Sequence, residues 1–179
     1  MKQEFLNYLT ENNIHKDGTL TDTSTLWFEP TILVLDELVN RNAMNLTNEE
    51  HDELFDRLGI TETDIIENSV IAAGSVRDML EVINEFRTID IEENYNFVVR
   101  YFADYILSNP EKIQTLGKVK RALSELKEAG YKITLVTNDS RLPAEAVLKV
   151  AGIGDLFDFV GTTDEFPSKP ATDSLVAIQ

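Results

Sequence analysis

The chain has 179 residues, no cysteine and a formal net charge of −16, with 32 acidic residues against 16 basic ones. The lack of thiols excludes disulfides, thiolate metal sites and a cysteine nucleophile, and it fits the reducing cytoplasm in which we expect the protein to act. The acidic surface would repel the phosphates of nucleic acids and of anionic lipids, so the composition predicts neither nucleic acid nor membrane as a partner.

The N-terminal segment KQEFLNYLTENN, residues 2–13, clusters its apolar side chains and favours a short amphipathic helix. It is interrupted by acidic residues and lacks the apolar core of a signal peptide, so it does not indicate secretion. No run in the sequence approaches the roughly 18 apolar residues that a membrane span needs.

Residues 24–116 show helical spacing of apolar side chains almost throughout. Three pairs resemble the capping box that opens a helix: Thr47 with Glu50, Thr61 with Asp64, and Ser75 with Asp78. We therefore expect a set of antiparallel helices here. Two apolar faces carry this prediction: Val76, Met79, Leu80 and Ile83, then Ile91, Tyr95, Val98, Val99, Phe102 and Ile106.

After Gly117 the pattern changes to short strands alternating with helices. An amphipathic helix ends near Gly130, an apolar run over 133–136 predicts a buried parallel strand, a second helix ends near Gly152, and LFDFVGTTD supplies another strand. This order is typical of a parallel α/β sheet. Ligands of such sheets bind beyond the carboxyl ends of the strands, which here means residues 137–139 and 161–164.

Three segments carry a resemblance to a known family: KDGTLTDT at 16–23, TLVTND at 134–139 and SKPATDSL at 168–175. In this order, around a helical insert, they resemble the haloacid dehalogenase-like (HAD) phosphatases, and the insert resembles the cap of the phosphoglycolate phosphatase-like branch. The resemblance implies a Rossmann-like parallel α/β core, incomplete here, with an inserted all-helical cap. Residues 1–23 and 116–179 would form the core and residues 24–115 the cap.

The resemblance also implies the chemistry of a phosphatase. In the family an aspartate attacks phosphorus, a second aspartate two positions later acts as acid and base, and Mg²⁺, a hydroxyl and a lysine hold the phosphoryl charge. The acid/base residue maps to Asp17, which is also the expected metal ligand. The hydroxyl maps to Thr137 and the lysine to Lys169.

Three further positions are expected to bind substrate. Gly18 would allow the tight turn after the first strand, Thr19 would lie near that turn, and the backbone N–H of Asn138 would face the phosphate. The implied substrate is a small phosphorylated metabolite.

Each segment also has a simpler interpretation. Asp17-Gly18 is a common turn dipeptide, residues 137–139 could merely cap the following helix, and Lys169 before Pro170 could be a solvated surface lysine. Only their ordered coincidence favours a site.

The family's nucleophile position holds His15. Imidazole can be phosphorylated, but it does not hold Mg²⁺ as a hard carboxylate does; His15 could also bind a softer metal or be an idle surface group. Loss of a nucleophile costs on the order of 10⁴-fold or more in rate. We therefore expect a phosphatase by ancestry whose activity is impaired or lost.

Two other departures from the family's sequence pattern affect the same catalytic centre. The lead-in LTENNIH is too polar for the family's first buried strand, so that strand is expected to be absent, shortened or displaced. The sequence ends at Gln179, inside a helix expected from about residue 172, before the acidic pair that completes the family's Mg²⁺ site. With only Asp17 remaining, Mg²⁺ binding should be weak or absent.

Two alternatives to an impaired hydrolase remain open. One is a non-catalytic regulatory module that keeps the phosphate cradle of Thr137 and Lys169, and the other is a protein-interaction module. A sheet edge left unpaired by the missing segment would favour homo-oligomers or partner contact.

Overall fold

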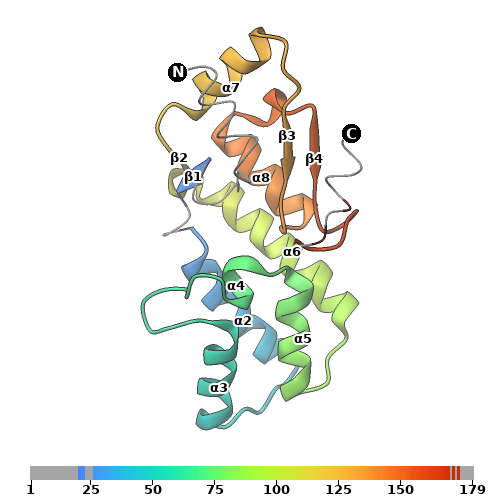
Figure 1. The fold of residues 1–179 in the computed structure, drawn as a ribbon. Coiled ribbons are helices and arrows are strands. Elements are labelled where there is room, and N and C mark those ends of the chain that lie inside the picture. The colour runs from blue at the N-terminus through green and yellow to red at the C-terminus, as the bar shows by residue number, and fades with distance from the viewer. Residues whose placement is uncertain (1–19, 23–25, 170, 172, 174–179) are drawn as a thin grey trace.

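The computed structural model describes residues 20–22, 26–169, 171 and 173. Helices α2 to α5 gather at one end of the molecule, and α7, α8, β3 and β4 gather at the other, with α6 running between the two groups (Figure 1). The first group, together with the first half of α6, is called the helical unit below, and the second group the α/β unit. The predicted fold class, an α/β core with an inserted set of helices, is confirmed.

The helical unit is built from α2 (Phe28–Arg41), α3 (Asn48–Leu58), α4 (Val70–Ala73) and α5 (Val76–Phe86). The capping boxes predicted at Thr47 and Ser75 are both present and open α3 and α5. Amphipathic helices bury their apolar faces against each other because that removes hydrocarbon from water. The shared core contains Val34, Leu35, Leu38, Leu54, Leu58, Met79, Leu80, Ile83 and Val98.

The third predicted capping box is wrong. Thr61 Oγ1 does accept a hydrogen bond from Asp64 N at 2.9 Å, and it donates to Asp64 O at 2.9 Å, so the local pattern exists. No helix follows, because the segment closes into a turn in which Ile60 pairs with Ile65 across an antiparallel bridge. A threonine three residues before an acid therefore signals a local hydrogen bond, and the next residues decide whether it opens a helix.

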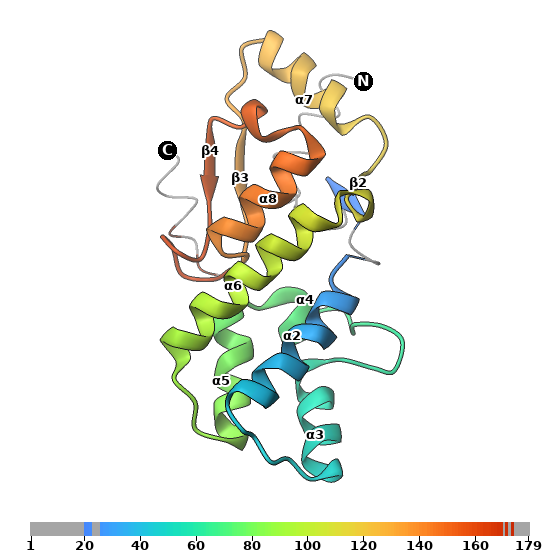
Figure 2. The same cartoon turned by 180° about the vertical axis from the view of Figure 1, so that it is seen from behind.

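Helix α6 (Ile91–Ser108) is shared by the two units. Val98 and Phe102, near its middle, belong to the core of the helical unit. Its second half contributes Ala103 and Ile106 to a separate cluster that includes Val147 of α8. One continuous helix thus joins the two cores, as both views show (Figures 1 and 2).

The connection after α6 holds a short 3₁₀ turn, η1 (Pro110–Lys112), and strand β2 (Gln114–Thr115). Strand β2 pairs with β1 (Thr21–Asp22) in the antiparallel sense. Thr21 lies opposite Thr115 in this ladder, so the chain enters and leaves the helical insert side by side.

The α/β unit follows the predicted alternation: α7 (Val119–Glu128), β3 (Thr134–Val136), α8 (Arg141–Ala151), η2 (Gly154–Leu156) and β4 (Phe159–Gly161). Strands β3 and β4 are parallel, with Leu135 opposite Val160. Gly130 and Gly152 follow α7 and α8 with φ values of 84° and 64°, a left-handed conformation that glycine adopts without the steric cost of a Cβ. Because the strands are parallel, their carboxyl ends meet at one edge, which faces the helical unit (Figure 2).

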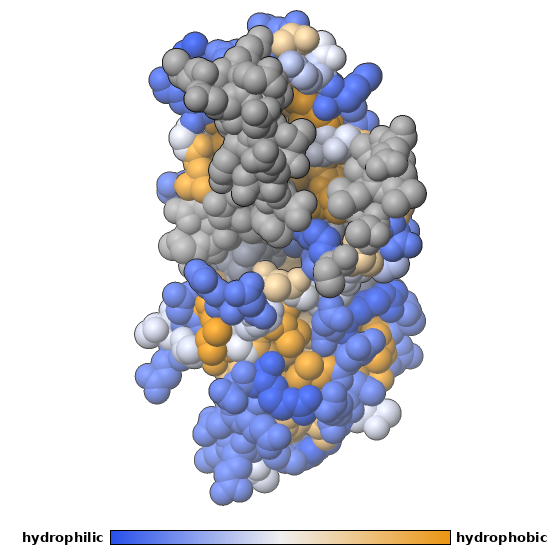
Figure 3. Space-filling view, in the orientation of Figure 1, coloured by the Kyte–Doolittle hydropathy of each residue, from blue (hydrophilic) through white to orange (hydrophobic). Residues whose placement is uncertain are grey.

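The surface of the helical unit is largely hydrophilic in the view of Figure 3, with smaller hydrophobic patches among the hydrophilic residues. This agrees with the excess of acidic residues in the sequence. Across the part of the chain that the structure describes, no helix has both the length and the apolar composition needed to cross a bilayer.

Candidate functional site

The predicted site residues divide into two groups. His15, Asp17, Gly18 and Thr19 lie outside the described residues, as does the expected helix over 2–13. Thr137, Asn138 and Lys169 lie within them, and the structure brings these three together at the carboxyl end of β3.

Thr137 is the first residue after β3, and its side chain is buried. Its N–H donates to Gly161 O at 3.0 Å, which extends the pairing of β3 with β4 by one step. Its Oγ1 accepts a hydrogen bond from Asp139 N at 3.2 Å. The hydroxyl of Thr137 is therefore held where β3 ends and the following loop begins, and not on the face of a helix.

Lys169 reaches the same point from the far end of the chain. Its N–H donates to Asn138 Oδ1 at 2.7 Å, which fixes the backbone of Lys169 to the loop after β3. Its Nζ donates to Val136 O at 3.4 Å, so the ammonium lies over the last residue of β3, beside Thr137. Lys169 is half-buried, which differs from the fully solvated surface lysine of the simpler interpretation.

The capping interpretation of residues 137–139 is also wrong. The N-cap of α8 is Ser140, one residue later. The first backbone N–H of the helix, at Arg141, donates to Asp164 Oδ2 at 2.9 Å, so the loop after β4 supplies the carboxylate at this helix end. An anionic oxygen at a helix N-terminus is favoured by both the unpaired N–H groups and the helix dipole.

The loops after β3 and β4 are joined directly. Thr163 N donates to Asp139 O at 3.1 Å, and Thr163 Oγ1 lies 3.4 Å from Asn138 O. The two ranges indicated by the strand-end rule, 137–139 and 161–164, therefore form one hydrogen-bonded surface. We call residues 137–140, 161–164 and 169 the strand-end cluster.

Sequence reasoning missed Tyr95 as a member of this region. Its side chain was expected only as part of the apolar face of a helix, yet its hydroxyl is 2.9 Å from Ser140 Oγ and hydrogen-bonds to Asp164. Burial raises the pKa of Tyr95, and the hydrogen bond to the Asp164 carboxylate raises it further. A phenol among aliphatic residues on an amphipathic face was the signal available, because a buried hydroxyl requires a partner.

An ion-pair network supports the cluster from the outside. Arg141 Nε donates to Glu165 Oε1 at 2.7 Å, and Glu165 Oε2 accepts from Thr162 Oγ1 at 2.8 Å. The Arg141 guanidinium lowers the pKa of the Glu165 carboxyl to about 2, with burial opposing and the Thr162 hydrogen bonds adding to the effect. This carboxylate is therefore charged at neutral pH and serves to hold the loop after β4.

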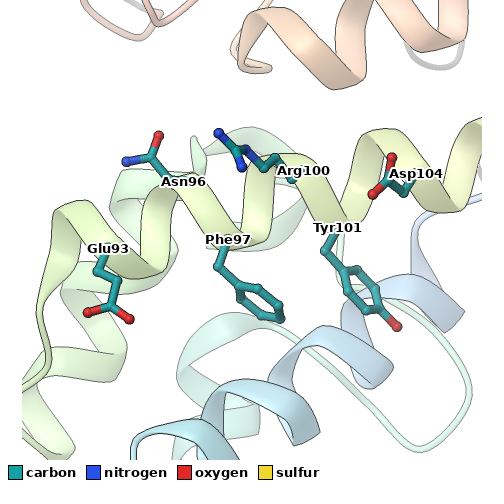
Figure 4. A pocket seen from close by; sticks show the side chains of 6 residues that line it. All are labelled: Glu93, Asn96, Phe97, Arg100, Tyr101 and Asp104. Atoms are coloured by element: carbon teal, nitrogen blue, oxygen red, sulfur yellow. The ribbon is translucent and has the colours of Figure 1, made fainter.

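A separate hollow of about 540 Å³ lies along α6 and contains none of the predicted site residues. Figure 4 shows Phe97 and Tyr101 projecting from α6 toward α2, while Asn96 and Arg100 project from the other side of the helix. The lining of the hollow is Glu93, Asn96, Phe97, Arg100, Tyr101 and Asp104.

Comparison with protein families matches residues 16–178 to the model of the haloacid dehalogenase-like hydrolases. The chain belongs to this family. The resemblance seen in the sequence is thus confirmed at the level of the superfamily. Comparison with curated proteins finds no match.

Solved structures of HAD-like proteins share the fold. CbbY from Rhodobacter sphaeroides, determined in complex with phosphate, has a TM-score of 0.61 and 17% identity, with 90% of this chain and 67% of that chain covered. A HAD phosphatase from Thermococcus onnurineus has a TM-score of 0.53 and 20% identity over 90% of this chain and 66% of that one. A predicted phosphoglycolate phosphatase from Haemophilus somnus has a TM-score of 0.52 and 18% identity, with the same coverage. The chain spans about two thirds of the length of these proteins.

Proposed function

We propose that this HAD-like chain binds the phosphoryl group of a small phosphorylated metabolite at the strand-end cluster. The observation that carries the proposal is that Lys169, 32 residues after Thr137 in the sequence, contacts both neighbours of Thr137 at the end of β3: its Nζ donates to Val136 O and its N–H to Asn138 Oδ1. A hydroxyl and an ammonium at one edge of a parallel sheet are the groups that stabilise phosphoryl charge. The local positive group is needed because the net charge of −16 repels anions.

Each residue has a distinct part in this proposal. Lys169 supplies the charge, Thr137 a hydroxyl, and the backbone N–H of Asn138 a further donor. Gly18 and Thr19 would contribute from the turn after the first strand, and Asp17 would be the group that exchanges a proton with the leaving alcohol. Only the first three residues lie in the described part of the chain.

We infer that turnover is impaired because the attacking position holds His15. A non-catalytic phosphate-binding protein is therefore the second candidate function, and it uses the same cradle. The HAD family typically uses Mg²⁺, but the donor set here fits it poorly: an imidazole stands where a carboxylate is needed. Among the described residues no three His, Asp or Glu side chains form a group able to hold a metal.

The binding test is a titration of the protein with inorganic phosphate and with orthovanadate. Binding is measured by calorimetry and by backbone NMR. The variant is Lys169→Gln, and the matched control is Lys149→Gln, which removes the same charge from an exposed side chain of α8. A charge-assisted hydrogen bond contributes about 1.5–3 kcal/mol, so Lys169→Gln should weaken binding by roughly 10-fold or more. Equal affinities for the two variants, or no binding by the unsubstituted chain, would refute the proposal.

The turnover test uses p-nitrophenyl phosphate with and without Mg²⁺. We expect the natural sequence to hydrolyse p-nitrophenyl phosphate no faster than the uncatalysed background. The His15→Asp variant is measured in the same assay to see whether it gains activity. Hydrolysis by the natural sequence that disappears in His15→Ala would show that His15 is a working nucleophile and that our view of impaired turnover is wrong.

A further inference from the structure

Two sets of hydrogen bonds, called ties below, connect the helical unit to the strand-end cluster. The first runs from α6, where the Tyr95 hydroxyl lies 2.9 Å from Ser140 Oγ and also hydrogen-bonds to Asp164. The second runs from α4, where Ala73 O accepts a hydrogen bond from Asn138 Nδ2 at 2.7 Å. The two ties come from different helices and reach both ends of the same loop, residues 138–140.

The position of Tyr95 is fixed from its own side. The Arg77 guanidinium lies over the phenol ring, 4.4 Å from its centroid, and Arg77 is held in turn by Glu92 through bonds of 2.6 and 3.2 Å. A cation over an aromatic face is attracted by the ring quadrupole and restricts the ring's motion. The hydroxyl of Tyr95 therefore points from a restrained ring toward the α/β unit.

The body of α6 is fixed to α8 as well. Ala103 and Ile106, two and three turns after Tyr95, pack with Val147 of α8. The Tyr95 hydroxyl meets Ser140 at the start of that same helix α8. Packing at one end and a hydrogen bond at the other define the orientation of α6 along α8.

From Tyr95 the contacts continue into the phosphate cradle. One oxygen of Asp164 bonds to Tyr95 and the other accepts from Arg141 N at 2.9 Å. The neighbouring Thr163 N donates to Asp139 O at 3.1 Å, and Asp139 N donates to Thr137 Oγ1 at 3.2 Å. A continuous set of hydrogen bonds thus links a phenol of the helical unit to the threonine of the cradle.

We propose that Tyr95 is a positioning residue: its hydroxyl holds Asp164 and Ser140 so that the loops after β3 and β4 keep the arrangement that binds phosphate. The proposal rests on the proposed function, because phosphate is its ligand. Tyr95 touches no substrate in this scheme; it acts through Asp164, Thr163 and Asp139 on Thr137.

The expected loss of phosphate affinity follows from the fraction of molecules whose loops have the binding-competent arrangement. If losing the hydroxyl lowers the fraction of molecules with correctly arranged loops, the apparent affinity falls by that same fraction. Coupling energies between sites in proteins begin at about five-fold in affinity. We therefore expect Tyr95→Phe to weaken phosphate binding about five-fold.

The experiment compares Tyr95→Phe with Tyr105→Phe. Tyr105 lies on the same helix, is also half-buried, and its hydroxyl accepts a hydrogen bond from Lys112 Nζ at 2.6 Å, a contact that involves none of the strand-end cluster. Both variants keep the aromatic ring and lose one hydrogen-bonded hydroxyl. Both should lose stability to a similar extent in urea, but only Tyr95→Phe should weaken phosphate binding. Unchanged affinity in Tyr95→Phe, or the same loss in both variants, would overturn the proposal.

Failure of the proposed function is separable from failure of this coupling. If the unsubstituted chain binds no phosphate, the proposed function is wrong, and the coupling is then judged without ligand by hydrogen exchange of the amides of Asp139 and Thr163. The coupling predicts faster exchange at both amides in Tyr95→Phe and not in Tyr105→Phe. Equal exchange in the two variants would show that Tyr95 holds nothing in place at the cradle.

Discussion

Asn138→Asp tests the tie between α4 and the loop after β3 with a change of one atom. The amide nitrogen, which donates to Ala73 O at 2.7 Å and to Lys169 O at 3.5 Å, becomes an oxygen of a charged carboxylate, while Oδ1 keeps its bond from Lys169 N at 2.7 Å. The lost hydrogen bond costs about 1 kcal/mol, and bringing two acceptors together in a half-buried position costs about 1 kcal/mol more. We expect a total destabilisation of about 2 kcal/mol, to which the preserved bond from Lys169 N to Oδ1 makes no contribution.

The measurement is urea unfolding followed by circular dichroism at pH 7. With an m value of about 2 kcal/mol/M, the midpoint should fall by about 1 M. The matched control is Asn96→Asp on α6, where the exposed amide donates to Glu92 O at 2.9 Å, because water can solvate both oxygens there. The control should shift by about 0.2 M or less. Equal shifts in the two variants would refute the reasoning, since the Ala73 contact would then contribute nothing beyond a surface hydrogen bond.

Two further predictions concern the α/β unit. Ile106→Ala, at the contact between α6 and α8, should destabilise the protein by about 2–5 kcal/mol in urea unfolding because the Ile106 residue is only 1% exposed. Leu107→Ala, at a residue that is 45% exposed, should change the free energy of unfolding little. Similar losses in the two variants would show that α6 is not anchored there. The Asp158 carboxyl, whose pKa is lowered to about 2 by the Lys127 ammonium and the Ile133 N–H, should stabilise the fold above its unfolded pKa near 3.9, with that contribution lost as the pH falls toward 2. In urea titrations between pH 5 and 2, Asp158→Asn should therefore show a flatter pH dependence than the unsubstituted chain, and parallel curves would contradict this assignment.

Much of the fold was predictable because local patterns and their tertiary environment agree. The apolar face with Leu80 and Ile83 is buried as expected, and the capping boxes at Thr47 and Ser75 open helices. The box at Thr61 failed because its hydrogen bonds are satisfied equally well in a turn. A local hydrogen bond alone does not specify the structure that follows it.

The candidate site was only partly predictable. The strand-end rule indicated residues 137–139 and 161–164, and the structure joins these loops through Thr163. The rule could not indicate Tyr95, because its helix belongs to another part of the sequence and its spacing is that of an ordinary core residue. A hydrogen bond between residues 45 or 69 positions apart leaves no trace in local periodicity.

The sequence by itself determined the class of protein: ordered motifs, helical spacing and short apolar strands identify a HAD-like α/β core with a helical insert. Only the tertiary structure decided which residues share the strand-end cluster and how the helical unit is attached to it. The reason is physical. Periodicity and capping depend on neighbours within a few residues, whereas the contacts of Lys169 with β3 and of Tyr95 with Asp164 form only when distant segments pack together.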